Sequence, residues 1–166
     1  VLFNKIISVE KKYNIIYLNK LLINIVYIFH YYLKIDLTFF LESYFKKLII
    51  QNNYKLWHFI FTNYKSLLLI NVLKKLDQKI IVTFQGADIQ INKKIHYGNR
   101  LNPKYEKLLK KSLINIDLFT AISKNIFKDL KKLKINSSKI VSIPNGTLID
   151  KALTVKVKTN KKNTKI

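Results

Sequence analysis

The residues best suited to binding chemistry follow runs of β-branched and aromatic side chains. The first such segment, residues 80–88, reads Ile-Ile-Val-Thr-Phe-Gln-Gly-Ala-Asp, so a strand-like run leads directly into a polar turn. Gly86 allows a sharp turn or the close approach of a ligand. Gln85 and Asp88 can hydrogen-bond the hydroxyl groups of a sugar. A plain Gly-Asp turn without a ligand is the alternative interpretation.

Two further segments have the same form. Residues 119–123, Phe-Thr-Ala-Ile-Ser, bring Ser123 to the start of a helical pattern. The free N–H groups and positive dipole end of a helix N-terminus can accept a phosphate or carboxylate, although serine is also a common helix cap. Residues 143–146, Ile-Pro-Asn-Gly, place Asn145 and Gly146 in another predicted turn, since Asn-Gly readily adopts positive φ.

Short apolar runs alternate with segments of helical period from residue 38 onward, which is typical of βαβ units and predicts a mostly parallel sheet. The strands are apolar on both sides, so helices are expected over both faces, as in a three-layer, Rossmann-like α/β domain. Ligands of such domains bind at the carboxyl ends of the strands, where the polar turns lie. Helices are predicted over residues 38–50, 64–76, 103–115 and 124–134, and strands over residues 56–61, 79–84, 116–121 and 139–143.

One domain is expected over residues 1–150, with its first-strand region incomplete, followed by a basic linker or tail over residues 151–166. The pattern of the first 35 residues does not distinguish helix from strand. Its longest apolar run, residues 21–33, is interrupted by Asn24 and His30. Because this run is shorter than the roughly 20 residues of a membrane-spanning helix, a buried helix or strand is expected instead.

The composition excludes several classes of active site. The sequence has no cysteine, which rules out disulfides, zinc–thiolate sites and cysteine nucleophiles. Three glycines are too few for the glycine-rich loops that bind nucleotides. His30, His58 and His96 lack metal-binding spacing, and no close pair of carboxylates suggests a two-acid hydrolase. No metal site is therefore predicted.

The charge is strongly positive. Thirty-one basic residues against nine acidic ones give a formal net charge of +22. Arg100 is the only arginine, and the excess of lysine, isoleucine and asparagine looks like a low-GC coding bias. Reading of base edges favours the planar fork of arginine, which argues against a dedicated nucleic-acid binder. The positive surface should still attract anionic partners such as nucleotide phosphates or acidic lipid headgroups.

Taken in order, three segments resemble the amino-terminal domain of family-four glycosyltransferases with the GT-B fold. They are residues 80–88, residues 117–123 (Asp-Leu-Phe-Thr-Ala-Ile-Ser) and residues 140–146, which end in Ile-Pro-Asn-Gly. Three ordered motifs are more specific than any one alone. The resemblance covers residues 79–150, and residues 57–76 fit the preceding strand and helix more weakly.

The resemblance implies one half of a retaining, hexosyltransferase-like enzyme of polysaccharide biosynthesis. Such an enzyme moves a sugar from a nucleotide sugar to a glycan or lipid-linked acceptor. This half would hold the acceptor, with residues 85–88, Ser123 and residues 145–146 lining the cleft. The nucleotide sugar is a co-substrate bound mainly by a carboxy-terminal domain, and no other cofactor is implied.

Two departures from the family pattern affect this expectation. The family commonly has histidine at the position of Gln85, and glutamine cannot titrate near neutral pH. The sequence also ends where the linker to the donor-binding domain would begin. This chain is therefore expected to be inactive without a carboxy-terminal partner.

Other functions stay open. A noncatalytic basic module could bind an anionic membrane surface or nucleic acid through helices with one lysine-rich face. A different Rossmann-like enzyme, such as a dehydrogenase, is disfavoured by the missing glycine fingerprint. The start of the sequence does not resemble a secretory signal, so we expect a cytoplasmic protein. Peripheral contact with the inner face of the membrane is compatible with the transferase hypothesis.

Overall fold

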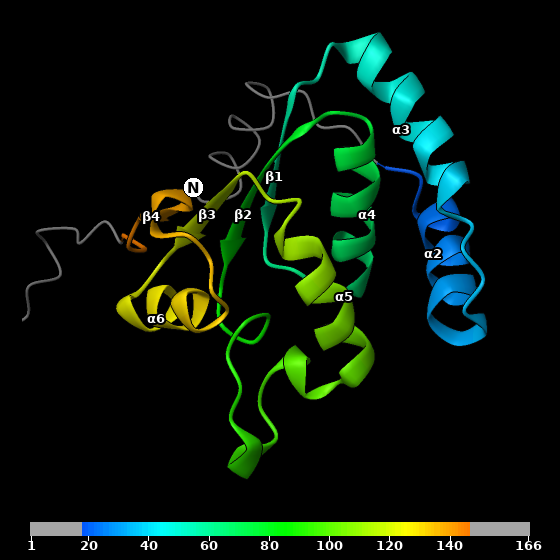
Figure 1. Ribbon diagram of the computed structural model, residues 1–166. Helices are drawn as coiled ribbons and strands as arrows, with labels where there is room; N and C mark the ends of the chain where they lie inside the picture. Colours follow the sequence, from blue (N-terminus) through cyan, green and yellow to red (C-terminus); the bar gives the residue numbers. More distant parts are fainter. Residues whose placement is uncertain (1–17, 147–166) are drawn as a thin grey trace, which may run out of the picture.

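Four parallel strands form the sheet of the computed structural model, which describes residues 18–146 (Figure 1). The strands lie side by side in the order in which they occur in the sequence. They are β1 (Leu56–Ile60), β2 (Lys79–Phe84), β3 (Leu118–Ala121) and β4 (Ile140–Ser142). The predicted α/β class with a Rossmann-like parallel sheet is confirmed.

The two faces of the sheet differ in burial. Partners in a parallel register share a face, so Val82, Phe119 and Ile140, which are aligned across three strands, lie on the same side. All three side chains are buried. On the opposite face of the edge strand β1, Leu56 is 57% exposed and Ile60 is 67% exposed. The main core of the described residues therefore lies on one side of the sheet.

Each pair of consecutive strands is joined by a helix: α4 (Tyr64–Lys75), α5 (Pro103–Leu113) and α6 (Lys124–Lys132). The strands of this sheet follow one another in sequence order. When each connection is right-handed, such an order places every connecting helix on the same face of the sheet. Phe119 of β3 agrees with this rule, because it lines one hollow together with residues of both α5 and α6. The sequence predicted helices over both faces, but within residues 18–146 these connecting helices share one.

The amino-terminal helices pack against α4, at the right of Figure 1. Helix α2 (Lys20–Ile28) continues into a π-helix (Phe29–Leu33), and α3 (Thr38–Asn52) follows. The apolar run over residues 21–33 is therefore helical, but only Val26 in it is fully buried and Leu21 is 71% exposed. Within residues 18–146, no helix is both long and apolar enough to cross a membrane.

Local sequence explains where the helices begin. The side chain of Asn63 accepts from the N–H of Ser66, and the Ser66 hydroxyl accepts from the N–H of Asn63, which forms a capping box before α4. Asn102 caps α5, and Pro103 occupies its first turn, where a missing N–H has no cost. The four helices predicted after residue 37 begin at the predicted residues. The predicted tail, residues 151–166, lies outside the described residues.

Candidate functional site

The carboxyl ends of three neighbouring strands meet at one edge of the sheet. Phe84 at the end of β2 is aligned with Ala121 at the end of β3, and Ala121 is aligned with Ser142 at the end of β4. Neighbouring strands are about 4.8 Å apart. The predicted site segments, which follow these three residues directly, therefore start from the same edge. Of the predicted site residues on these segments, the exposed ones are Gln85, Ser123, Asn145 and Gly146.

Asp88 is buried beneath this edge, with an exposed fraction of 0%. Its Oδ1 accepts from the backbone N–H of Gly86 at 2.9 Å and of Gln85 at 3.0 Å, and its Oδ2 accepts from the N–H of Thr62 at 3.1 Å. Burial raises the pKa of Asp88, and these N–H groups oppose that shift in part. Asp88 holds the loops after β1 and β2 together, and it has no exposed atom for the predicted contact with a sugar hydroxyl.

Tyr105 of α5 completes this buried network. Its hydroxyl donates to the backbone carbonyl of Asp88 at 2.8 Å and lies 2.9 Å from the Thr62 hydroxyl. Burial raises the pKa of Tyr105 well above its usual range, so the phenol stays a hydrogen-bond donor. One helix and the loops after two strands are thus fixed relative to one another by three polar side chains.

The loop between β2 and α5 contains two glycines at positive φ. Gly86 has a φ of 143° and is buried, so it shapes the loop and has little surface for the predicted ligand contact. Gly98 has a φ of 112°, and a Cβ there would lie 2.0 Å from the backbone oxygen of Gln90. Only glycine fits at this second position, where two backbone segments cross.

The residue after β1 is also strained. Phe61 has a φ of 72°, an uncommon value for a bulky side chain, while its N–H donates to the Thr83 carbonyl at 2.9 Å. Strain of this kind gathers at functional sites. Sequence reasoning singled out the ends of three strands but not this fourth one, although the polar pair Thr62-Asn63 follows β1 in the same manner.

Ser123 caps α6, as the simpler interpretation of its position predicted. Its hydroxyl oxygen accepts from the N–H of Ile126 at 3.3 Å, and the residue itself is exposed at the strand edge. The turn predicted at Asn145 and Gly146 is not observed, because neither residue has positive φ and residues 143–146 form no turn.

A cavity of about 530 Å³ opens between the π-helix, the start of α4 and the later part of the β2–α5 loop, and none of the predicted strand-end residues lines it. We call it the edge pocket. It is lined by the amides of Asn63, Asn99 and Asn102, by His96, and by tyrosines that include Tyr64. Amide groups match hydroxyl-rich ligands, and tyrosine offers a flat apolar ring with a polar tip. This pocket was missed from the sequence, because most of its residues come from helix starts and the long β2–α5 loop.

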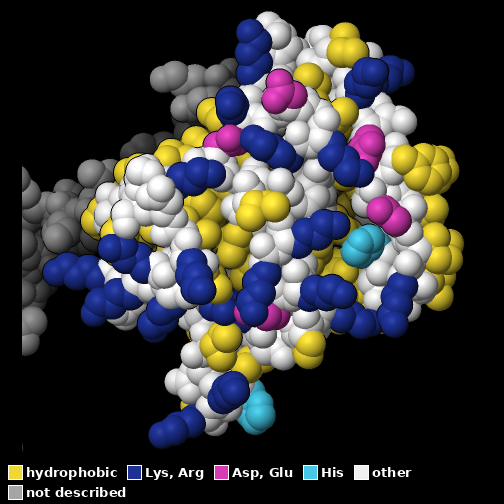
Figure 2. All heavy atoms as spheres, in the orientation of Figure 1, with side chains coloured by type: hydrophobic (Ala, Val, Ile, Leu, Met, Phe, Trp, Pro, Cys, Tyr) yellow, Lys and Arg dark blue, Asp and Glu magenta, His cyan; other side chains and the backbone are white. Residues whose placement is uncertain are grey.

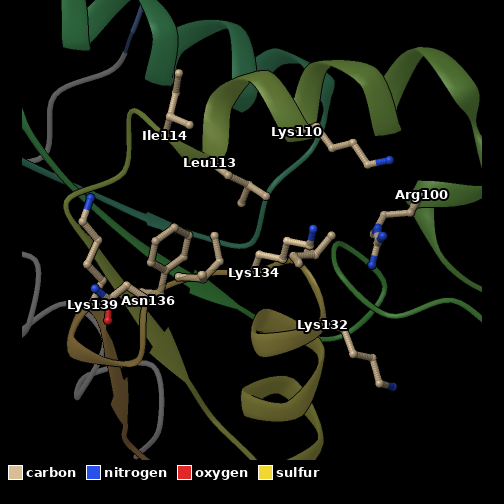
Figure 3. Close-up of a pocket in the computed structure, with 11 residues that line it drawn as sticks. Arg100, Lys110, Leu113, Ile114, Lys132, Lys134, Asn136 and Lys139 are labelled. Atoms are coloured by element: carbon tan, nitrogen blue, oxygen red, sulfur yellow. The ribbon is translucent and has the colours of Figure 1, made fainter.

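A second hollow, of about 640 Å³, lies between α5 and α6 (Figure 3). Lys110 and Lys132 approach it from the two helices, and Arg100 approaches from the β2–α5 loop. Figure 2 shows lysine and arginine side chains spread over this face of the molecule, with few acidic side chains among them. The basic composition is thus displayed on the helical side of the sheet.

The histidines lie apart, each with a different surrounding. His30 Nδ1 is 2.9 Å from the Tyr64 hydroxyl, and burial lowers the pKa of His30 despite the opposing charge of Asp36. His58 Nε2 is 2.7 Å from the Thr83 hydroxyl, on the sheet face opposite the core. Within residues 18–146, no three histidine or acidic side chains gather as a metal site would require.

One of three comparisons with known proteins identifies a family for this chain. No curated protein and no solved structure matches the chain. The family model described as Glycosyltransferase Family 4 matches residues 12–151, which is well over half of the 166-residue sequence. The three strand-end segments that carry the sequence resemblance lie within that match. The chain therefore belongs to Glycosyltransferase Family 4.

Proposed function

We propose that this chain is the acceptor-side part of a retaining glycosyltransferase. It would help to transfer a hexose from a nucleotide sugar to a glycan or lipid-linked acceptor. The observation that carries the proposal is the edge of the sheet, where exposed polar residues follow neighbouring parallel strands in a chain of this family. Strand ends of this kind are where open α/β sheets bind their ligands.

The residues at the edge would divide into two groups. Gln85, Ser123, Asn145 and Gly146 are exposed and would face the acceptor. Asp88 would act as a positioning residue, because its carboxylate fixes the backbone that carries Gln85. The family match favours this proposal over the basic binding module that the charge alone allows.

The phosphates of the donor would be bound mainly by a second, carboxy-terminal domain. The chain would then work in the cytoplasm, and its lysine-rich helical face would contact the inner face of an anionic membrane. A glycan attached to a membrane lipid could reach the strand edge from that surface. The proposed place in polysaccharide biosynthesis follows from such an acceptor.

A reconstitution assay tests the proposal. The chain is mixed with the donor-binding half of a family-four glycosyltransferase, and nucleotide release is measured with several nucleotide sugars and acceptors. Turnover is expected in the mixture and not with either half by itself. Gln85→Ala should reduce it, since the side chain is exposed at the strand edge, while Lys46→Gln on the surface of α3 should not.

Two results would contradict the proposal. One is a lack of nucleotide release with every donor and every donor-binding half. The other is turnover that responds equally to Gln85→Ala and to Lys46→Gln, because the strand edge would then have no special part in the reaction. Circular dichroism of each variant separates a loss of folding from a loss of activity.

A further inference from the structure

A cavity of about 410 Å³ lies where the π-helix approaches α5 and the start of α4. We call it the basic pocket. Four lysines line it, one from the end of the π-helix and three from α5, together with His30 and Asp36. The lysines are Lys34, Lys104, Lys107 and Lys111. Its volume falls within the range of cavities that bind small molecules.

The positive charge of the basic pocket is poorly balanced by protein groups. Among residues 18–146, none of the ion pairs involves any of its four lysines. Of the acidic residues that the structure describes, Asp36 alone lines it, and one oxygen of that carboxylate already accepts from the N–H of Thr38 at 2.9 Å. Lys107 and Lys111 are one helical turn apart, where like charges repel each other. A bound anion would relieve this repulsion.

The hollow between α5 and α6 in Figure 3 is a weaker anion site. It is lined by five basic residues, and the carboxylates of Glu106 and Asp129 already contact three of them. Arg100 and Lys110 both pair with Glu106, and Lys132 pairs with Asp129. An anion in that hollow would have to compete with these carboxylates.

The π-helix gives the basic pocket a shaped aromatic wall. The ammonium of Lys104 lies over the ring of Tyr31, with 4.3 Å between Nζ and the ring centre. The same Nζ donates a hydrogen bond to the backbone carbonyl of Tyr31 at 2.9 Å. His30, one residue earlier, contacts the hydroxyl of Tyr64. π-Helices are rare and often occur at functional sites. Here the π-helix supplies His30 and Tyr31 to the pocket.

The basic pocket adjoins the edge pocket, since Tyr31 and Tyr64 line both. One side of this pair of tyrosines is thus lined by lysines, and the other is lined by Asn63, Asn99 and Asn102. The amides of Asn63 and Asn102 also cap helices, and the Asn99 amide donates to the Thr62 carbonyl, so each has only part of its hydrogen-bonding capacity left for a ligand. We propose that the two pockets together bind a phosphorylated sugar, with the phosphate among the lysines and the sugar ring against the amides and tyrosines. Lysine ammonium groups suit phosphate as charged hydrogen-bond donors. If the proposed transferase function holds, this phosphorylated sugar is part of the acceptor.

The proposal is tested with the full chain and three probes: inorganic phosphate, glucose and glucose 1-phosphate, at constant ionic strength in a phosphate-free buffer. The histidine ring signals in NMR spectra report the location, after assignment with single His→Gln variants. Phosphate should shift His30 in the basic pocket, glucose should shift His96 in the edge pocket, and glucose 1-phosphate should shift both. His58, on the opposite face of the sheet, should stay unchanged.

Charge-matched variants test the role of the lysines. Lys107→Gln with Lys111→Gln should weaken glucose 1-phosphate binding about tenfold or more, because two charged donors are lost, and should leave glucose binding as it was. Lys46→Gln with Lys47→Gln removes the same charge from the exposed surface of α3 and should change the affinity less than about twofold. Melting curves should show both variants folded.

Three outcomes would overturn the proposal. The first is that both double variants weaken glucose 1-phosphate binding equally. The second is that glucose and glucose 1-phosphate bind with equal affinity. The third is that the response to phosphate is lost in Lys132→Gln with Lys134→Gln and kept in Lys107→Gln with Lys111→Gln. The binding experiment needs no donor-binding half. Its failure would leave the proposed transferase activity standing, and a lack of turnover would leave the phosphate site standing.

Discussion

The carboxylate of Asp88 accepts a hydrogen bond from the backbone N–H of Thr62 at 3.1 Å, although the two residues follow different strands. Both residues are fully buried. The same carboxylate binds two N–H groups of its own loop. A single side chain therefore sets the relative position of the loops after β1 and β2, and through them one end of the edge pocket.

Asp88→Asn should destabilise the protein by about 1–3 kcal/mol, the typical effect of breaking a buried, charge-assisted hydrogen bond. An amide has one acceptor oxygen in place of two, and its NH₂ group would face backbone N–H donors. Urea unfolding followed by fluorescence measures the change. Asp129→Asn is the matched control, since Asp129 pairs with Lys132 on the surface, and it should change the stability by less than about 0.5 kcal/mol. Equal stability of both variants would contradict the positioning role of Asp88.

Gly98→Ala should lower the free energy of unfolding of the protein by about 1–3 kcal/mol or more. Gly98 has a φ of 112°, and the added Cβ would meet the backbone oxygen of Gln90. Gly146→Ala provides the control, since no atom of residues 18–146 lies within 4 Å of a Cβ at that position and its φ is not positive. Thermal unfolding of the two variants compares them directly. A Gly98→Ala protein as stable as Gly146→Ala would show that the loop can move away.

Glu106 should contribute to the stability of the protein at neutral pH and lose that contribution in acid. The guanidinium of Arg100 donates to it at 2.7 Å and 3.0 Å, and these bonds hold the pKa of Glu106 below its usual range despite partial burial. The stabilisation is complete above the unfolded-state pKa of about 4.3 and disappears as the pH falls through the lower native value.

Glu106→Gln should therefore lower the stability at pH 7 by about 1–3 kcal/mol and flatten its decline below about pH 5. Urea titrations at several pH values measure both effects. Arg100→Gln with Lys110→Gln removes both cations that contact Glu106 and should flatten the same pH dependence. If Glu106→Gln flattens the pH dependence further when added to this double variant, the two ion pairs are not the cause.

Ser123→Ala should destabilise the protein by about 1 kcal/mol, because the N–H of Ile126 would lose its capping oxygen. Ser123→Asp keeps an acceptor at the helix N-terminus and adds a favourable negative charge, so it should retain the wild-type stability. Ser43→Ala, within α3, should change the stability by less than about 0.5 kcal/mol. Thermal unfolding measures the stability of the three variants. If Ser123→Ala were as stable as Ser43→Ala, the capping role of Ser123 would be refuted.

Local patterns were sufficient to predict most elements of the fold. The run over Lys79–Phe84 was predicted with its observed bounds, because it is continuously β-forming and flanked by polar residues. Helix starts were equally clear from Asn63, Asn102 and Ser123, whose side chains cap the first turn. Helix ends were less clear: the predicted end of α6 at Lys134 is two residues too late, since Lys134 adopts a left-handed φ of 62° that ends the helix.

The site required more than local pattern. The sequence by itself determined that polar residues follow successive strands of a parallel sheet, because side-chain type and periodicity are local properties. It did not show which of these residues would be buried. Only the tertiary structure decided that Asp88 faces the backbone of another loop, and that the π-helix and α5 bring four lysines around one cavity. Such contacts join residues far apart in the chain, and the packing that brings them together leaves no periodic trace in the sequence.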